Sequence, residues 1–406
     1  MVDQTRNSWT SDTSGNAIML FSLVLIPILL VAAFAVDNSR QISADRHLQA
    51  AIDAASLAGA RGLEDASKTD AEIESIAQNA FQGNLGTMHN DVACGNATIT
   101  IDRTNSTVNV ASTCAVNTMF GESLSPETMS VSTAATARAN VTKLDLALML
   151  DVSGSMGGQK LIDLKSAAIN AANTLITPGT GDRVRVSFVS YATSVNAGQY
   201  GNLALGRAWD DDADGDGLEK VCVSERVGIA AWKDDEPGLA KWVGDDASSC
   251  PTSSLLPLTN NLTLFETEIN KLNAGGWTAG HLGIAWSWYL IAPEWDSIWP
   301  SASEPRGYTD PDTVKAVILM TDGQFNTAYE WAHGNSNQQA RKMCDEMRDE
   351  DVLVYSVAFQ APSSAKATLE DCAGTSERFF DASNGQELLD AYAAIASQLS
   401  ALTLVD

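Results

Sequence analysis

Three polar clusters between positions 151 and 322 of this 406-residue chain could bind a metal ion. The apolar run LDLALMLD ends in Asp151, which opens a D-x-S-x-S pattern with Ser153 and Ser155. The run VKAVILMTDG contains Asp322, and the stretch GGWTAG between the two runs contains Thr278. Carboxylates and hydroxyls form a hard, oxygen-only ligand set, which suits Mg²⁺ or Mn²⁺.

The elements around these clusters alternate between strands and helices. Continuous apolar runs predict buried strands at 144–151, 183–192, 314–321 and 352–359. Apolar residues at helical spacing predict helices at 161–175, 261–272, 336–351 and 387–402. This alternation is typical of an α/β fold with a doubly wound, mostly parallel sheet. Ligands bind at the carboxyl ends of such strands, so the three clusters should meet at one edge.

Together these residues resemble the metal-ion-dependent adhesion site of von Willebrand factor type A domains. The resemblance extends over 144–402, with an insertion at 196–260. It implies that Ser153, Ser155 and Thr278 ligate the metal directly, and that Asp151 and Asp322 do so directly or through water. It also implies that an open metal position accepts a carboxylate from a protein partner, in binding and not in catalysis.

Two other functions compete with adhesion. A Mg²⁺-dependent hydrolase could use Asp151, but the dehalogenase pattern D-x-D-x-T needs an aspartate where Ser153 stands. No Walker-type glycine loop is present, and the four histidines suggest no Ser–His–Asp arrangement; we expect His281 to pack or to face solvent. The third function is a structural spacer whose metal only stabilises its loops.

The insertion contains an acidic stretch, DDDADGDGLE. Asp212, Asp214 and Asp216 match the start of a calcium loop, and Glu219 could assist. Position 12 of that loop is Val223 where a full EF-hand has Glu, so a Ca²⁺ site and a solvated acidic loop both stay open.

Five tryptophans lie close together in the sequence after the GGWTAG stretch begins. We expect core packing for most of Trp277, Trp286, Trp288, Trp295 and Trp299. Trp277 precedes Thr278 directly, which makes it the candidate for an exposed rim that contacts a partner or stacks on a sugar.

The six cysteines form three pairs of sequence neighbours, and none lies in a C-x-x-C motif. Their spacing predicts disulfides in an oxidising compartment, and buried cytosolic thiols are the alternative. The predicted pairs are Cys94–Cys114, Cys222–Cys250 and Cys344–Cys372.

Residues 17–36 form an uncharged apolar run that is long enough to cross a bilayer as a helix. The run is long for a cleaved signal peptide, so we expect an uncleaved single span, with 1–16 as a short cytoplasmic N-terminus. Flanking charges lean slightly against export of the C-terminal part, whereas the cysteines favour export.

The segment SGNAIMLFSLVLIPILLVAAFAVDNSRQISADRHLQAAIDAASLAGA is similar to the N-terminus of TadG-like proteins of Flp (tight-adherence) pilus assembly. This resemblance implies a bacterial inner-membrane protein that contacts pilus-assembly components, with its C-terminal domain in the periplasm or outside the cell. Related minor pilins carry Glu five residues after a processed Gly; here Leu20 follows Gly15 at that distance, so we expect no such cleavage.

Residues 37–143 predict a pilin-like helix followed by a small α+β stalk. ATITID and STVNVAST alternate apolar and polar residues around a turn and predict a hairpin, which Cys94 and Cys114 flank. The net charge of −26 argues against nucleic acid as a partner, because binding phosphates requires basic surface.

Overall fold

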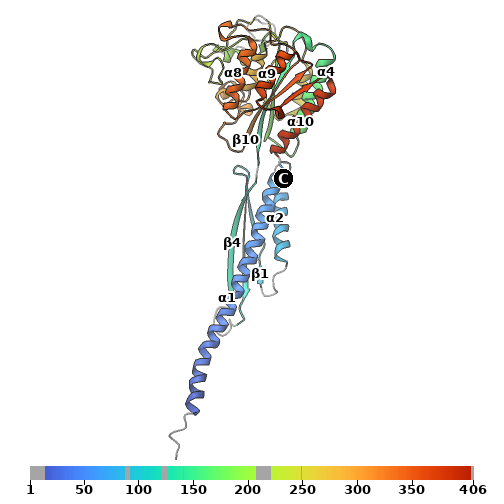
Figure 1. The fold of residues 1–406 in the computed structure, drawn as a ribbon. Helices are drawn as coiled ribbons and strands as arrows, with labels where there is room; N and C mark the ends of the chain where they lie inside the picture. Colours follow the sequence, from blue (N-terminus) through green and yellow to red (C-terminus); the bar gives the residue numbers. More distant parts are fainter. Residues whose placement is uncertain are drawn as a thin grey trace, which may run out of the picture. The chain divides into compact units, whose positions relative to one another are not determined.

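The computed structural model describes residues 14–86, 92–119, 127–139, 141–206, 221–247 and 249–403. The chain divides into two compact units, Met1–Asn140 and Val141–Asp406 (Figure 1). Each unit has its own sheet.

The first unit combines two helices with a small antiparallel sheet, in which β3 pairs with β1, β2 and β4. β2 and β3 form the predicted hairpin. The elements are α1 (Ser14–Leu63), α2 (Asp70–Leu85), β1 (Val92–Cys94), β2 (Thr98–Asp102), β3 (Thr107–Asn117) and β4 (Thr128–Arg138).

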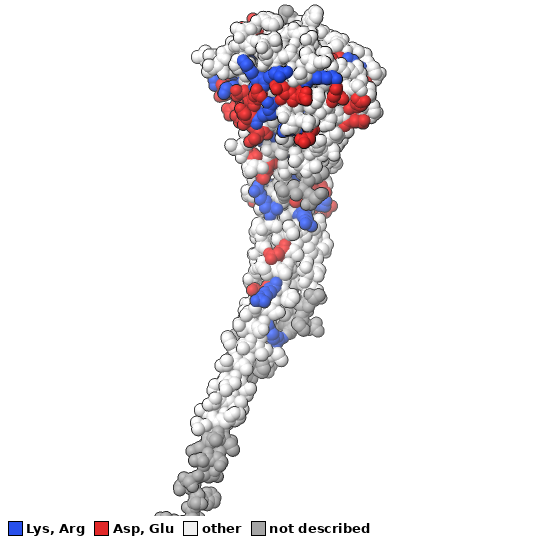
Figure 2. Space-filling view, viewed as in Figure 1, with Lys and Arg blue, Asp and Glu red and all other residues white. Residues whose placement is uncertain are grey.

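Helix α1 changes character along its length. Its stretch Met19–Leu63 includes an 18-residue window with a mean hydropathy of 2.8. Only 6% of that window is buried, so the window does not pack in a protein core. Above the grey atoms at its lower end, this apolar part of α1 is white in Figure 2 and carries no blue or red side chains. Further along, Leu48 and Ile52 are fully buried where α1 packs against α2 and the sheet. The helix is therefore long and apolar enough to span a membrane before it enters the folded part of the unit.

A capping box sets the start of α2. The Thr69 hydroxyl accepts a hydrogen bond from the peptide N–H of Glu72, and the Glu72 carboxylate accepts one from the peptide N–H of Thr69. Such caps satisfy amides that have no partner within the helix. Ile73, Ala77 and Phe81 then lie on the buried face of the helix.

The second unit is built on an eight-stranded sheet with helices on both faces. Its elements, with η for 3₁₀ helices, are β5 (Lys143–Asp151), η1 (Gly154–Met156), α4 (Gln159–Leu175), β6 (Val184–Tyr191), β7 (Val195–Asn196), α5 (Tyr200–Ala204), β8 (Cys222–Val223), η2 (Gly228–Ala230), β9 (Leu256–Thr259), α6 (Leu262–Asn270), α7 (Gly280–Tyr289), η3 (Pro293–Ile298), η4 (Ser301–Ser303), β10 (Thr313–Thr321), η5 (Trp331–His333), α8 (Ser336–Asp349), β11 (Leu353–Phe359), α9 (Ser363–Ala373), η6 (Ser376–Arg378), β12 (Phe379–Ala382) and α10 (Gly385–Thr403).

The strand order is β12-β11-β10-β5-β6-β7-β8. Pairing is parallel from β12 through β6, whereas β7, β8 and β9 pair antiparallel. Four of the five parallel strands, β5, β6, β10 and β11, are the predicted ones, whereas β12 was not predicted. The antiparallel strands lie in or next to the insertion. The sheet is thus mixed, within an α/β architecture.

Apolar residues of the central strands alternate between two cores. Leu146 and Leu148 point into the core formed with α4, α6 and α10, whereas Ala147 and Met149 point into the core formed with α7, α8 and α9. Figure 1 shows α8 and α9 on one side of the sheet and α4 and α10 on the other. Burial on both faces explains why these strands are continuously apolar.

A buried arginine fixes the insertion to the rest of the unit. The Arg226 guanidinium lies 5.3 Å from the ring centroid of Trp295 and 5.6 Å from that of Tyr289, and it donates hydrogen bonds to the carbonyls of Lys233 and Lys241. Trp295 and Tyr289 stack with ring centroids 3.9 Å apart. The cluster places most of the tryptophans in the core, as the sequence predicts; those that are buried are Trp286, Trp288, Trp295 and Trp299.

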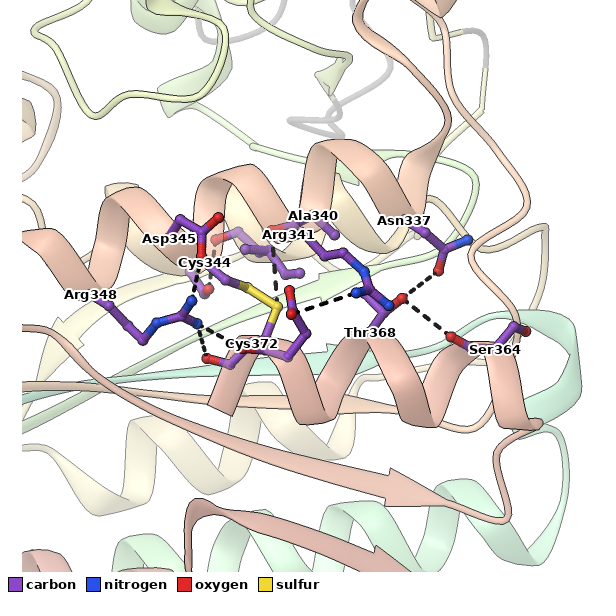
Figure 3. Close-up of a disulfide and its surroundings, with 12 residues drawn as sticks. Asn337, Ala340, Arg341, Cys344, Asp345, Arg348, Ser364, Thr368 and Cys372 are labelled. Carbon is purple, nitrogen blue, oxygen red and sulfur yellow. Dashed lines mark hydrogen bonds and ion pairs between the residues drawn. A yellow bond between two sulfur atoms is a disulfide. The ribbon is translucent and has the colours of Figure 1, made fainter. Parts of the chain in front are cut away.

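The six cysteines pair as their spacing predicts: Cys94–Cys114, Cys222–Cys250 and Cys344–Cys372. Figure 3 shows the last of these joining α8 to α9. Arg348 lies beside it and donates to the carbonyls of Asp371 and Cys372. Thr368 links the same two helices through a hydrogen bond to Asn337.

Two disulfides of the second unit offer a matched test, because each closes a separation of 28 residues. Loop-closure entropy predicts about 3–4 kcal/mol of stabilisation from each. Replacing Cys344 and Cys372 by Ala should lower the free energy of unfolding by about this amount, and replacing Cys222 and Cys250 should have a similar effect. Denaturant unfolding measures both; a double variant as stable as the parent would show that its bond contributes nothing.

Candidate metal centre

The three predicted polar clusters lie at the same edge of the sheet. Asp151 ends β5, and Asp322 directly follows β10, the parallel neighbour of β5. Ser153 precedes η1, and Thr278 lies two residues before α7. Parallel strands that end together bring their following loops together, which is why clusters far apart in the sequence become neighbours.

Hydrogen bonds connect the hydroxyls to Asp322. The Ser155 hydroxyl lies 2.5 Å from Asp322 Oδ1, and Ser153 Oγ lies 3.0 Å from Ser155 Oγ. An ionised carboxylate only accepts, so Ser155 donates to Asp322, and Ser153 must then donate to Ser155. The two serines and Asp322 therefore form one continuous chain of oxygen atoms.

Asp151 is fully buried and held by three donors. Its Oδ1 accepts the peptide N–H of Ser153 at 2.8 Å, and its Oδ2 accepts the hydroxyls of Thr321 at 2.6 Å and Tyr191 at 3.1 Å. Burial raises the pKa of Asp151; the hydrogen bonds from Ser153 and Thr321 act in the opposite direction, and the charge of Asp322 adds to the rise. A cation bound nearby would favour the ionised form of this carboxyl group.

Backbone contacts tie the Thr278 loop to the D-x-S-x-S loop. Gly154 donates its N–H to the carbonyl of Gly276 at 3.0 Å. Gly276 has φ +87°, which favours glycine, and a Cβ there would lie 2.6 Å from Thr193 Oγ1. The peptide N–H of Thr278 donates to Asn326 Oδ1 at 3.0 Å, so this loop is also joined to the segment after β10.

The hydroxyls of Ser155 and Thr278 meet over Gly323. A Cβ added to Gly323 would lie 3.4 Å from Ser155 Oγ and 3.4 Å from Thr278 Oγ1. The absence of a side chain at this position leaves a small cradle lined by oxygen atoms from all three loops.

The donor set fits a hard divalent cation. Across the described ranges, no three His, Cys, Asp or Glu side chains form a metal cluster, so a metal here would depend on hydroxyl oxygens as well as on two carboxylates. Mg²⁺ and Mn²⁺ prefer oxygen ligands, and Mg²⁺ commonly binds one or two carboxylates and retains water. The residues that would hold the ion are Asp151, Ser153, Ser155, Thr278 and Asp322.

Trp277 lies at the surface beside this site, with 68% of its area exposed. Its peptide N–H donates to Thr193 Oγ1 at 3.0 Å. Trp277 is therefore exposed next to Thr278, and its role as a rim residue stays a prediction. The acidic loop with Asp212, Asp214, Asp216 and Glu219 lies outside the described residues.

A buried, hydrogen-bonded group of Glu225, His281 and Ser336 was not predicted from the sequence. His281 Nδ1 lies 2.7 Å from Ser336 Oγ, and its Nε2 lies 2.8 Å from Glu225 Oε1. The carboxylate can only accept, so Nε2 carries a proton and Ser336 donates to Nδ1 when the ring is neutral. The connectivity is that of a nucleophile, base and orienting acid, but none of the three residues is more than 3% exposed. These buried hydrogen bonds join the insertion to α7 and α8.

Comparison with known proteins identifies the N-terminal segment. Residues 15–62 match the family model for Flp pilus-assembly TadE/G-like proteins. The predicted resemblance of this segment to TadG-like proteins is confirmed. Comparison with curated proteins finds no match.

Several solved pilus proteins resemble the chain at low sequence identity. The vWF domain of the type V pili tip protein Mfa5 from Porphyromonas gingivalis is 10% identical, with 66% of this chain and 98% of that chain covered and a TM-score of 0.42. The pilus adhesin SpaC from Lactobacillus rhamnosus GG is 12% identical, with 76% and 34% covered and a TM-score of 0.39. The PilB minor pilin from Streptococcus sanguinis is 10% identical, with 77% and 79% covered and a TM-score of 0.38. The chain thus spans about a third of SpaC.

Replacing Glu225 by Gln should destabilise the second unit in a pH-dependent way. Burial raises the pKa of Glu225, but the hydrogen bond and charge of His281 and the N–H of Tyr329 outweigh burial and leave the pKa below its usual 4.5. A lowered folded-state pKa stabilises the protein above the unfolded-state pKa, and that contribution is lost as pH falls through the folded-state pKa. We expect the free energy of unfolding of the variant to be about 1–3 kcal/mol lower than that of the parent at pH 7. This difference should become smaller below pH 4.5.

Thermal unfolding of the Glu225→Gln variant between pH 3 and pH 8 measures this effect. Glu370→Gln, an exposed position on α9, is the control and should follow the parent throughout. A constant difference between Glu225→Gln and the parent across this range would contradict the ionic role of Glu225.

Proposed function

We propose that the second unit binds Mg²⁺ or Mn²⁺ at its sheet edge and uses the metal to bind an acidic residue of a protein partner. The observation that carries this proposal is the convergence of Ser153, Ser155, Thr278 and Asp322 around Gly323. A cradle of hydroxyl and carboxylate oxygens next to an exposed indole suits recognition more than chemistry. No catalytic role is part of the proposal.

The N-terminal segment supports a proposal for the partner and for the place of action. The match of residues 15–62 to pilus-assembly proteins supports a role in Flp/Tad pilus assembly or surface adhesion, in contact with other pilus-assembly components. The apolar helix Met19–Leu63 supports a single-span anchor in the bacterial inner membrane. The three disulfides support an oxidising location for the rest of the chain, in the periplasm or outside the cell.

A structural spacer with a metal-stabilised domain is the second candidate. One observation favours it: hydrogen bonds within the protein already connect the three loops of the site. In that case the metal would add stability but no partner contact.

Metal binding is the first part of the proposal to test. Asp151→Asn and Asp322→Asn each preserve size and remove one charge, so each should abolish measurable binding of Mg²⁺ and Mn²⁺ in calorimetric titration of the full chain in detergent micelles. Asp390→Asn removes an exposed carboxylate from α10 and should bind as the parent does. Equal affinity in all four proteins would show that the metal, if bound, lies elsewhere.

Partner binding can be separated from stabilisation in the host bacterium. A chromosomal Asp151→Asn allele should reduce surface pili or adhesion to the level of a gene deletion, while immunoblots show a normal amount of the protein in the membrane. Normal piliation with normal protein level would favour the spacer.

A further inference from the structure

Lys160 reaches into the candidate metal centre from the start of α4. Its Nζ lies 2.7 Å from Asp322 Oδ2. The Asp322 side chain is fully buried, whereas 27% of the Lys160 side chain is exposed. An ammonium group therefore already provides a positive charge for one carboxylate of the site.

Both oxygens of Asp322 are engaged in this arrangement. Oδ1 accepts the hydroxyl of Ser155 and Oδ2 accepts the ammonium of Lys160. The second buried carboxylate, Asp151, raises the cost of leaving Asp322 without a counter-charge, because like charges in a buried site repel. Lys160 balances one of the two negative charges.

The position of Lys160 permits release. Its long aliphatic stem starts on the second residue of a helix, and its partly exposed ammonium can move to water without an unfavourable burial step. A second contact of the ammonium is weak, because Nζ lies 5.8 Å from the centroid of the Phe359 ring. A divalent cation that approaches Asp322 is repelled by this ammonium and competes with it for the same carboxylate.

We propose that Lys160 is a resident counter-ion of the metal site, which holds Asp322 in place while the site is empty and lowers its affinity for divalent cations. This inference rests on the proposed metal-binding function. Lys160 is a positioning residue and not a ligand. Its effect is to raise the concentration of divalent cation that is needed to half-fill the site.

The test compares Lys160→Met with the parent, using the full chain in detergent micelles and Mn²⁺ or Mg²⁺ alone as the probe. Removing a charged hydrogen-bond partner from the empty state should tighten metal binding roughly 10- to 100-fold. The melting temperature of the metal-free variant should fall, and added metal should raise it by more than it raises that of the parent.

Two further variants serve as controls. Lys165 lies on the same helix but donates to the carbonyl of Asn270, so Lys165→Met should leave metal affinity unchanged. Lys160→Arg keeps the positive charge and should bind metal much as the parent does, which separates charge from side-chain loss.

The outcomes distinguish this inference from the function on which it rests. If the parent binds metal and Lys160→Met binds it with equal or lower affinity, the role of Lys160 is overturned and the metal site stands. Absence of binding in both parent and Lys160→Met overturns the metal site together with the inference. Tighter binding in Lys160→Met, but not in Lys165→Met or Lys160→Arg, supports both the metal site and the role of Lys160.

Discussion

Parallel pairing of β5 with β10 is the constraint on which the whole candidate site depends. The register places Met149 beside Leu319, so both strands reach the same edge within a few residues of each other. Asp151 and Asp322 are neighbours only because of this pairing. In the sequence, 170 residues separate Asp151 from Thr321, whose hydroxyl donates a hydrogen bond to the Asp151 carboxylate. A shift by one residue would exchange the two apolar faces of each strand between the two cores, and burial on both sides opposes such a shift.

Bringing two carboxylates to one buried edge is unfavourable unless each is satisfied. Asp151 receives hydrogen bonds from a peptide N–H, Thr321 and Tyr191. Burial raises the pKa of Tyr191 well above its usual value, which keeps the phenol protonated and able to donate. Asp322 accepts hydrogen bonds from the Ser155 hydroxyl and the Lys160 ammonium. The same donors that offset burial also hold the loops in place, so a metal would meet a site that is largely ordered beforehand.

Local sequence patterns revealed the parts of the site that lie directly after strands. Asp151, Ser153, Ser155 and Asp322 follow apolar runs whose length and two-sided burial are readable from residue types, and Thr278 lies in a glycine-rich turn before a helix. The disulfide pairs were predictable because each joins sequence neighbours. Lys160 lies five residues after Ser155 and directly before the predicted helix 161–175, but the direction of its side chain depends on how the observed helix is rotated.

Other features had no such signal. Glu225, His281 and Ser336 are separated by 55 or 56 residues at each step, and Glu225 lies in an insertion whose path no periodic pattern predicts. The antiparallel strands β7 and β8 have two residues each, too few for an alternation to be recognised. These elements depend on tertiary packing, chiefly around Arg226 and the stacked aromatic rings.

The most direct test of the central claim is a crystal structure of the protein grown with Mn²⁺, with an anomalous difference map to locate the ion. The account predicts one strong peak at the sheet edge, within coordination distance of oxygens from Ser153, Ser155 and Thr278 and close to Asp151 and Asp322. A fully occupied Mn²⁺ peak elsewhere in the chain, with this edge empty, would contradict it.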